Sequence, residues 1–251
     1  MFDVHCHLEY MPNEVIEECR NLNCNAMTSV ANPSDFDRSL ILRQENSDTV
    51  FLSAGIHPTH VLEHSEAEIL SYIKKIKQNE KYISAIGEIG LDYWHVTDKT
   101  NQELTEKVFK QFLDLAEELK KPVVLHVRSG LSRDAFHRVF EIIGNYNMSF
   151  LIHFFSGKNE ELKHALEHGY MISINTVVCK SKSLKYIAKK IPMEHMVLET
   201  DSPWADPESN ELINRPWKIE KSAEIVAMIK KLPKNQVLEA TEKNARRFFD
   251  E

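Results

Sequence analysis

The chain begins MFDVHCHLEY, residues 1–10, an apolar run with two histidines in it. Phe2 and Val4 favour a β-strand, and side chains two residues apart share one face of a strand. His5 and His7 therefore lie on one face, where a buried strand would normally carry Val, Ile or Leu. Either ordinary hydrogen bonds satisfy both rings, or the protein needs nitrogen ligands there.

Similar apolar, β-rich runs recur to the end of the chain, separated by amphipathic helical stretches. The candidate strands are 2–7, 25–30, 50–56, 83–90, 122–127, 149–154, 170–176 and 196–201. Continuous apolar runs are typical of a parallel sheet covered by helices. The clearest helical pattern spans 102–121, and two more close the chain near 218–231 and 235–249.

Eight strand–helix units in 251 residues predict an α/β fold of the (β/α)8 TIM-type barrel class, a single hydrolase domain over 1–251. A doubly wound open sheet is the alternative. It would usually carry a glycine-rich phosphate turn after an early strand, and the chain has none. Neither a low-complexity linker nor a Pro-rich hinge suggests a domain boundary.

Composition narrows the class of protein. The formal net charge of −7 argues against a broadly basic nucleic-acid-binding surface, although a local basic rim stays open. No apolar run approaches membrane-spanning length, so we expect a cytoplasmic protein without membrane contact. Four cysteines without a C-x-x-C pair predict buried thiols rather than disulfides.

In a barrel of this kind the carboxyl ends of the strands converge on the active site. Six polar side chains fall at those ends: His5, His7, Glu88, His126, His153 and Asp201. Each has an ordinary explanation alone, since a lone strand histidine is more often a satisfied core residue and Asp201 could form a turn. Together, so many buried polar groups would be costly without a common partner, and a divalent metal is the natural one.

The ligand count predicts two divalent ions. His5, His7 and Asp201 would bind one ion, His126 and His153 the other, and Glu88 would bridge them. Ions about 4 Å apart commonly activate a shared water for phosphoryl transfer. Asp201 is the candidate to orient that water and accept its proton. Four histidines favour Zn or Mn over Mg by ligand softness, but availability in the cell leaves Mg open.

Six short motifs are distributed along nearly the whole chain: FDVHCHL (2–8), AGIHP (54–58), AIGEIGLDY (85–93), PVVLHVR (122–128), LIHFFSG (151–157) and VLETDSPW (197–204). In this order they resemble the TatD family of metal-dependent deoxyribonucleases, within the amidohydrolase-like barrels. The resemblance implies that the same six side chains are the metal ligands. It also implies that His57 lies beside the phosphate and that Arg128 can meet a phosphate.

The activity implied by the resemblance is phosphodiester hydrolysis by a two-metal-activated water. We expect a DNase that acts like a 3′–5′ exonuclease on single-stranded or frayed DNA, as a monomer, with an oligomer left open. The alternative enzyme is a metal-dependent hydrolase of another ester or amide, such as a cyclic amide or an aminoacyl-tRNA ester. A barrel that has lost catalysis and serves as a binding subunit is the non-enzymatic alternative.

Basic and aromatic residues follow several of the predicted strands. Arg128, Arg133, Lys158, Lys180 and Lys182 could steer a phosphate backbone, and Trp94 and Trp204 could stack on bases. Three stretches depart from the family pattern: Trp94-His95-Val96, Ser129-Gly130 and Asn214-Arg215-Pro216. None includes a predicted ligand, so we expect these departures to affect substrate preference.

Overall fold

A parallel barrel forms the centre of the molecule. The computed structural model describes residues 1–131, 133–209 and 211–249. The strands are β1 (Phe2–Cys6), β2 (Asn25–Val30), β3 (Val50–Ala54), β4 (Ala85–Asp92), β5 (Val123–Arg128), β6 (Phe150–Ile152), β7 (Met171–Asn175) and β8 (Met196–Glu199). Each strand pairs in parallel with the next one in the chain, from β1 to β8. This confirms the predicted (β/α)8 barrel. The assignment of residues 1–251 to a single domain stays a prediction.

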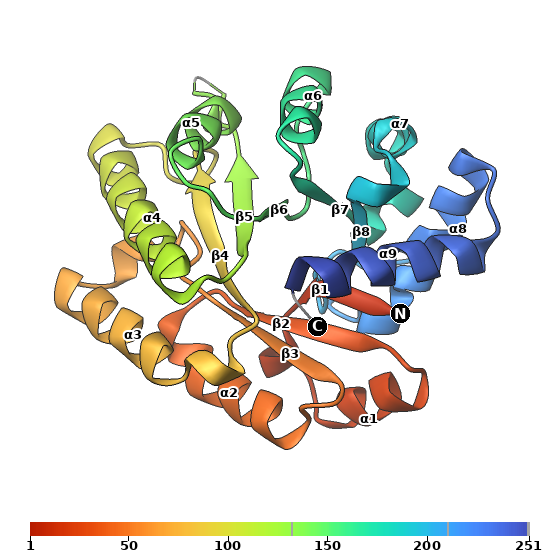
Figure 1. The fold of residues 1–251 in the computed structure, drawn as a ribbon, viewed down its shortest axis with the longest axis horizontal. Coiled ribbons are helices and arrows are strands. Elements are labelled where there is room, and N and C mark those ends of the chain that lie inside the picture. Colours follow the sequence, from red (N-terminus) through yellow and green to blue (C-terminus); the bar gives the residue numbers. More distant parts are fainter. Residues whose placement is uncertain (132, 210, 250–251) are drawn as a thin grey trace.

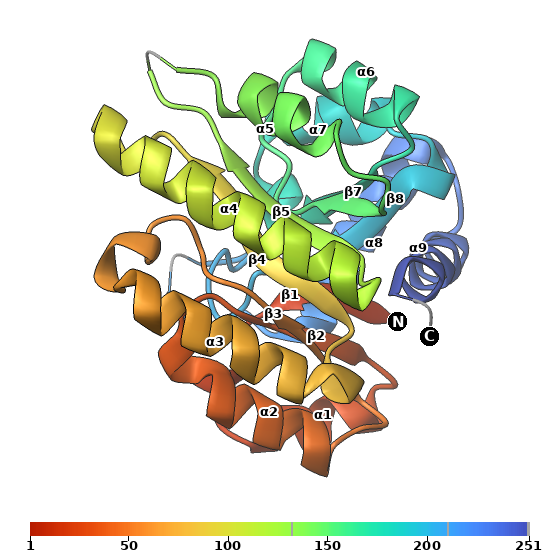
Figure 2. The same cartoon turned by 60° about the vertical axis from the view of Figure 1, so that its left-hand side comes forward.

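An outer layer of helices surrounds the strands (Figure 1). These are α1 (Glu14–Asn21), α2 (Phe36–Glu45), α3 (Glu66–Gln78), α4 (Lys99–Leu119), α5 (Ala135–Ile143), α6 (Asn159–Glu167), α7 (Lys182–Lys190), α8 (Ile219–Lys230) and α9 (Lys234–Phe249). Figure 2 shows α4 lying along the outside of β4 and β5. It begins earlier than predicted because the Asp98 side chain caps it, accepting from the Asn101 N–H at 3.1 Å.

Apolar side chains fill the amino-terminal end of the barrel. One buried cluster takes residues from most of the strands, among them Phe2, Met27, Phe51, Val124 and Val197, and adds Ala245 and Phe249 of α9. A larger cluster lies between the sheet and the helices. Among the described residues, hydrocarbon thus fills this end of the barrel.

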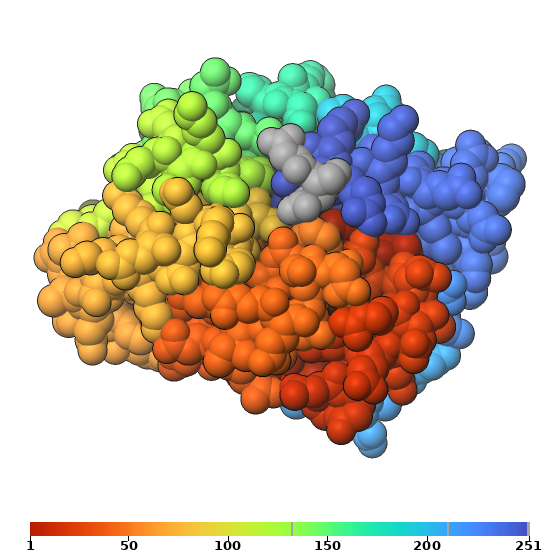
Figure 3. Space-filling view, turned by 60° about the horizontal axis from the view of Figure 1, so that its bottom comes forward, coloured from red at the N-terminus to blue at the C-terminus, as the bar shows by residue number. Residues whose placement is uncertain are grey.

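The two ends of the chain meet where the barrel closes. Among the described residues, β1 and β8 are joined by isolated backbone hydrogen bonds and not by a regular strand ladder. The Asp201 N–H donates to His5 O at 2.9 Å, and the His7 N–H donates to Ser202 O at 2.8 Å. Thr200 donates to the buried Asp3 carboxyl through its N–H and its hydroxyl. This seam places residues about 200 positions apart side by side. The space-filling view shows the red amino-terminal segment beside the blue carboxyl-terminal helices (Figure 3), and the Met1 ammonium pairs with Glu242 of α9 at 2.8 Å.

Irregular strand pairing accompanies two of the predicted ligands. The register between β1 and β2 shifts between Asp3 and Cys6, around His5. The register between β4 and β5 shifts between Ile86 and Ile89, around Glu88. Such irregularities redirect side chains and are frequent beside active sites. Gly90 allows the close approach of β5, because a Cβ there would lie 2.0 Å from His126 O.

The cysteines and the lengths of the helices bear on two expectations from composition. Cys6, Cys19 and Cys24 are buried free thiols, and Cys179 is a partly buried one, as predicted. Among the described residues, every helix is too short or too polar to traverse a lipid bilayer.

Candidate metal centre

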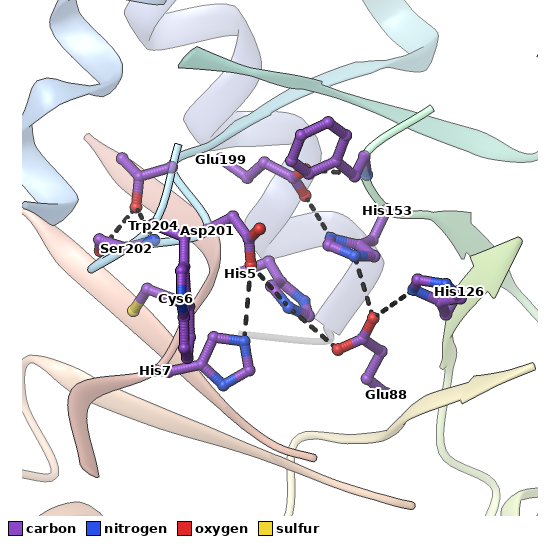
Figure 4. A network of polar contacts seen from close by, with 12 residues as sticks. His5, Cys6, His7, Glu88, His126, His153, Glu199, Asp201, Ser202 and Trp204 are labelled. Carbon is purple, nitrogen blue, oxygen red and sulfur yellow. Dashed lines mark hydrogen bonds and ion pairs between the residues drawn. The ribbon is translucent and has the colours of Figure 1, made fainter. Parts of the chain in front are cut away.

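Six polar side chains from five strands or strand ends converge at the open end of the barrel (Figure 4). His5 is fully buried, and its Nε2 lies 3.4 Å from Glu88 Oε2 and 3.7 Å from Asp201 Oδ1. His7 Nε2 lies 3.5 Å from the same oxygen of Asp201. The residues predicted to bind the first ion therefore lie together.

Glu88 lies between the two halves of this group. Its Oε2 faces His5, whereas its Oε1 lies 2.7 Å from His126 Nδ1 and 3.0 Å from His153 Nε2. The His5 and His153 rings stack with centroids 3.8 Å apart. One carboxylate thus faces histidines on both sides, which is the arrangement that a bridging ligand requires.

The chemistry of this group fits divalent metal. Neither ring nitrogen of the buried His5 forms a hydrogen bond within the described residues, and leaving such a group unpaired costs about 1–3 kcal/mol. His5, Glu88 and His153 each offer a donor atom, all within 4.8 Å of one another, and so do His5, His7 and Asp201. Imidazole with carboxylate suits Zn and Mn, and carboxylate oxygens suit Mg.

Three carboxylates that sequence reasoning missed lie behind the histidines. His7 Nδ1 lies 3.2 Å from Glu9 Oε1, His126 Nε2 lies 3.2 Å from Asp92 Oδ2, and His153 Nδ1 lies 3.2 Å from Glu199 Oε2. Each carboxylate accepts from the nitrogen directed away from the centre, which leaves the lone pair of the other nitrogen directed inward. The H-x-E spacing of Glu9 was a visible signal, but Asp92 comes from β4, beside the strand of His126, and Glu199 comes from β8, two strands away from β6.

The carboxylates create a field that favours a cation. Burial alone would lower the pKa of His7, but its contacts with Asp201 and Glu9 raise that pKa to about 10. Burial would likewise raise the pKa of Glu88, yet the surrounding histidines, His153 foremost, keep it well below the usual range. In the metal-free protein a proton satisfies this field, and a divalent ion can replace it.

His57 lies beside these groups in the loop after β3. Its Nδ1 accepts from the Thr59 N–H at 3.2 Å, so in the neutral ring the proton is on Nε2. Nε2 lies 3.1 Å from His126 Nδ1 and 3.7 Å from Glu88 Oε1. Burial and the neighbouring His126 lower the pKa of His57 to about 3. At neutral pH His57 is therefore an uncharged donor aimed at the centre.

A pocket of about 720 Å³ opens above the centre. We call it the metal pocket; its walls include Tyr10, His57, Arg128, Phe154 and Trp204. The Trp204 ring lies edge-on to His7, with centroids 5.0 Å apart, and also contacts Tyr10 at 5.6 Å. The volume of the metal pocket suits a small organic ligand.

Other predicted substrate contacts are engaged within the protein. Lys180 Nζ donates to the backbone oxygens of Asp206 and Ser209, and Arg133 pairs with Glu106 at 3.0 Å. Asn214 is fully buried, and its amide donates to the oxygens of Thr200 and Trp204. Asn214 was expected to influence substrate preference. The structure places it outside the metal pocket, where its amide hydrogen bonds stabilise the loop after β8.

Comparisons with known proteins give a consistent picture. The family model described as TatD related DNase matches residues 2–250. An uncharacterized metal-dependent hydrolase of Methanocaldococcus jannaschii is 34% identical over 252 residues, covering 98% of this chain and 96% of that protein. Deoxyribonuclease TATDN3 of Homo sapiens is 28% identical over 265 residues, covering 99% of this chain and 94% of that protein. The crystal structure of YJJV, a TatD homolog from Escherichia coli, superposes with a TM-score of 0.88 at 20% identity, covering 100% and 98% of the two chains.

Proposed function

Because the chain belongs to the TatD related DNase family of metal-dependent hydrolases, we propose that it hydrolyses phosphodiester bonds in single-stranded or frayed DNA. The observation that carries the proposal is the buried His5 ring, which forms no hydrogen bond within the described residues although it lies where Glu88, Asp201 and His153 meet. Trimming from the 3′ end, a cytoplasmic location and a monomeric state belong to the same proposal.

The six converging side chains would bind two divalent ions, Zn, Mn or Mg. His5, His7 and Asp201 would form one set, His126 and His153 the other, and Glu88 would belong to both. When bound, such ions polarise a phosphodiester and lower the pKa of a water. Glu9, Asp92 and Glu199 would fix the orientation of the ligand rings.

Asp201 is the candidate proton acceptor. Burial would raise the pKa of its carboxyl, but His7, His153 and His5 lower it, so the group is ionised at neutral pH. Asp201 orients the attacking water and takes one of its protons. The water oxygen forms a bond to phosphorus as the phosphorus–oxygen bond to the leaving alcohol breaks; the leaving oxygen takes a proton from solvent, and Asp201 returns its proton to solvent. The products are a phosphate monoester and an alcohol.

His57 and Arg128 would bind the phosphate itself. The uncharged Nε2–H of His57 can donate to a non-bridging oxygen without repelling the cations of the centre. The Arg128 guanidinium, at the end of β5 on the wall of the same pocket, adds a fixed positive charge. Both stabilise the charge that accumulates on the phosphate oxygens.

Metal analysis paired with an activity assay tests the proposal. We expect the purified protein to contain divalent metal and to shorten a labelled single-stranded oligonucleotide, with activity lost on chelation and restored by Zn, Mn or Mg. Glu88→Gln removes the negative charge and one of the two oxygens of the shared carboxylate, and should lower both metal affinity and activity by about 100-fold. Glu141→Gln, an exposed carboxylate paired with Arg138 outside the metal pocket, is the matched control.

The same protein separates the competing functions. A metal-loaded wild type that leaves DNA intact but hydrolyses a cyclic amide or an aminoacyl-tRNA would contradict the nuclease proposal and support the alternative hydrolase. A protein without metal or hydrolytic activity would favour a binding subunit. A 3′ label released before a 5′ label would support the proposed direction.

A further inference from the structure

A second hollow of about 580 Å³ adjoins the metal pocket. Arg128 and Ser156 line both. We call it the Trp94 hollow; its other walls include Trp94, Gly130 and Lys158, from the loops after β4, β5 and β6. None of the catalytic steps above requires the Trp94 hollow, although the hollow begins at Arg128, the residue proposed to bind the scissile phosphate.

Arg128 differs from the neighbouring arginines in having no acidic partner. Arg133 and Arg138 both pair with Glu106, at 3.0 and 2.7 Å. Across 1–131, 133–209 and 211–249, the Arg128 guanidinium forms neither an ion pair nor a hydrogen bond, and it lies 5.4 Å from the centroid of the Trp94 ring. The arginine is thus placed by an aromatic ring, which leaves its donors available to a ligand.

The acidic groups near the Trp94 hollow have partners on their own loops. Asp134 Oδ1 accepts from the Phe136 N–H and the Ser129 hydroxyl, both at 2.9 Å. Glu161 Oε2 accepts from the Lys158 N–H at 2.8 Å. These carboxylates cap the starts of α5 and α6, and among the described residues neither forms an ion pair with Arg128 or Lys158.

The aromatic face in the Trp94 hollow suits a nucleobase. Trp94 is 48% exposed, and a large aromatic ring at that exposure beside an unpaired arginine is typical of sites that stack bases and bind phosphates of single strands. A paired base would keep its faces stacked within the duplex, so only an unpaired nucleotide can lie on this ring.

We propose that the Trp94 hollow binds the nucleotide adjacent to the scissile phosphodiester of a single DNA strand. Its base stacks on Trp94 and its outer phosphate lies beside Lys158, while Arg128, which lines both pockets, binds the scissile phosphate between them. This subsite rests on the proposed phosphodiesterase function and adds to it a requirement for substrate length and for an unpaired end.

The test uses substrates of increasing length. Bis(p-nitrophenyl) phosphate fills the metal pocket alone, whereas oligo(dT) of two to six nucleotides extends into the Trp94 hollow. We expect kcat/KM to rise with length until that hollow is filled, and Trp94→Ala to remove about 10-fold of this gain beyond any loss on the small diester, where Trp94 acts only by positioning Arg128. Trp94→Phe should keep most of the gain, because it retains a stacking ring.

Tyr186→Ala is the matched control, because Tyr186 is 53% exposed and lies under the Lys190 ammonium on α7, outside both pockets. It should leave the length dependence intact. Equal losses in Trp94→Ala on the small diester and on oligo(dT), or no loss on either, would overturn the subsite.

Binding of labelled oligo(dT) without divalent metal separates this inference from the proposed function. Wild type that binds the strand, with about 10-fold weaker binding in Trp94→Ala, supports the subsite even if no phosphodiester is cut. Hydrolysis of the small diester without any effect of Trp94→Ala on strand binding would leave the phosphodiesterase standing and contradict the subsite.

Discussion

Glu199 fixes the ring of His153. His153 Nδ1 donates to Glu199 Oε2 at 3.2 Å, while Nε2 on the other side of the ring faces Glu88 at 3.0 Å. The second oxygen of Glu199 accepts from the Phe154 N–H at 2.8 Å, so the carboxylate cannot rotate freely. A histidine at a strand end is thereby given one orientation and one tautomer.

Glu199→Gln should weaken metal binding without removing a ligand. The amide can still accept from the Phe154 N–H but cannot hold the imidazole as a charged acceptor does. We expect a loss of about 10- to 100-fold in affinity for the more weakly bound ion, measured by competition with a chelator. An unchanged affinity, with unchanged visible absorption of the Co²⁺-substituted protein, would contradict this role.

Asp92→Asn tests the corresponding role behind His126. Asp92 Oδ2 contacts both His126 Nε2 at 3.2 Å and His95 Nδ1 at 2.8 Å. We expect about 10- to 100-fold weaker metal binding at the proposed site of His126 and His153, with binding at the proposed site of His5 and His7 retained. His95→Ala removes only the outer contact and should leave the metal content at the wild-type level; equal losses in the two variants would refute the assignment.

Metal binding should release protons. The metal-free protein keeps His7 protonated at pH 7, because its pKa is raised to about 10, and a metal ligand must give up that proton. Apparent metal affinity should therefore increase as pH rises from 6 towards 10. Calorimetry at pH 7 in two buffers of different ionisation enthalpy measures the release. Identical heats in both buffers would show that His7 is not a ligand or is already neutral.

Gly90→Ala should destabilise the barrel at the β4–β5 contact. The added Cβ would lie 2.0 Å from His126 O, at a backbone φ of +146°. We expect a loss of more than about 2 kcal/mol in the free energy of unfolding, measured by urea denaturation. Gly169→Ala is the control, because its φ of +75° is also left-handed but nothing lies within 4 Å of the new Cβ. It should cost only about 1 kcal/mol.

Glu106 should contribute to stability at neutral pH and lose that contribution in acid. Burial would raise its pKa, but Arg138, Tyr93 and Arg133 lower it below 4.5. A carboxylate with a depressed folded pKa stabilises the protein above its unfolded pKa, and the effect disappears as pH falls through the folded value. Glu106→Gln should therefore reduce the melting temperature at pH 7 and have little effect near pH 3. Glu103→Gln on the same helix should change neither; an equal loss at both pH values would contradict the electrostatic cause.

Local patterns in the sequence were sufficient for the strands, the barrel class and the group of histidines and carboxylates at the strand ends. This is because a parallel strand buried on both faces must be apolar throughout, so each polar residue at its end is visible against that background. Two of the three carboxylates behind the predicted ligands, Asp92 and Glu199, were invisible for the complementary reason: they meet their histidines across strands, and no spacing within one strand encodes that contact.

The sequence by itself determined that eight apolar strands, several of them ending in ligand-type residues, would form a barrel with a polar open end. Only the tertiary structure decided which hydrogen bonds close the β1–β8 seam beside His5 and Asp201, and that Arg128 lies over Trp94 while Lys180 donates to a neighbouring loop. The physical reason is that periodicity records burial one residue at a time, whereas the closing bonds of the barrel and the pairing of charges depend on residues far apart in the chain.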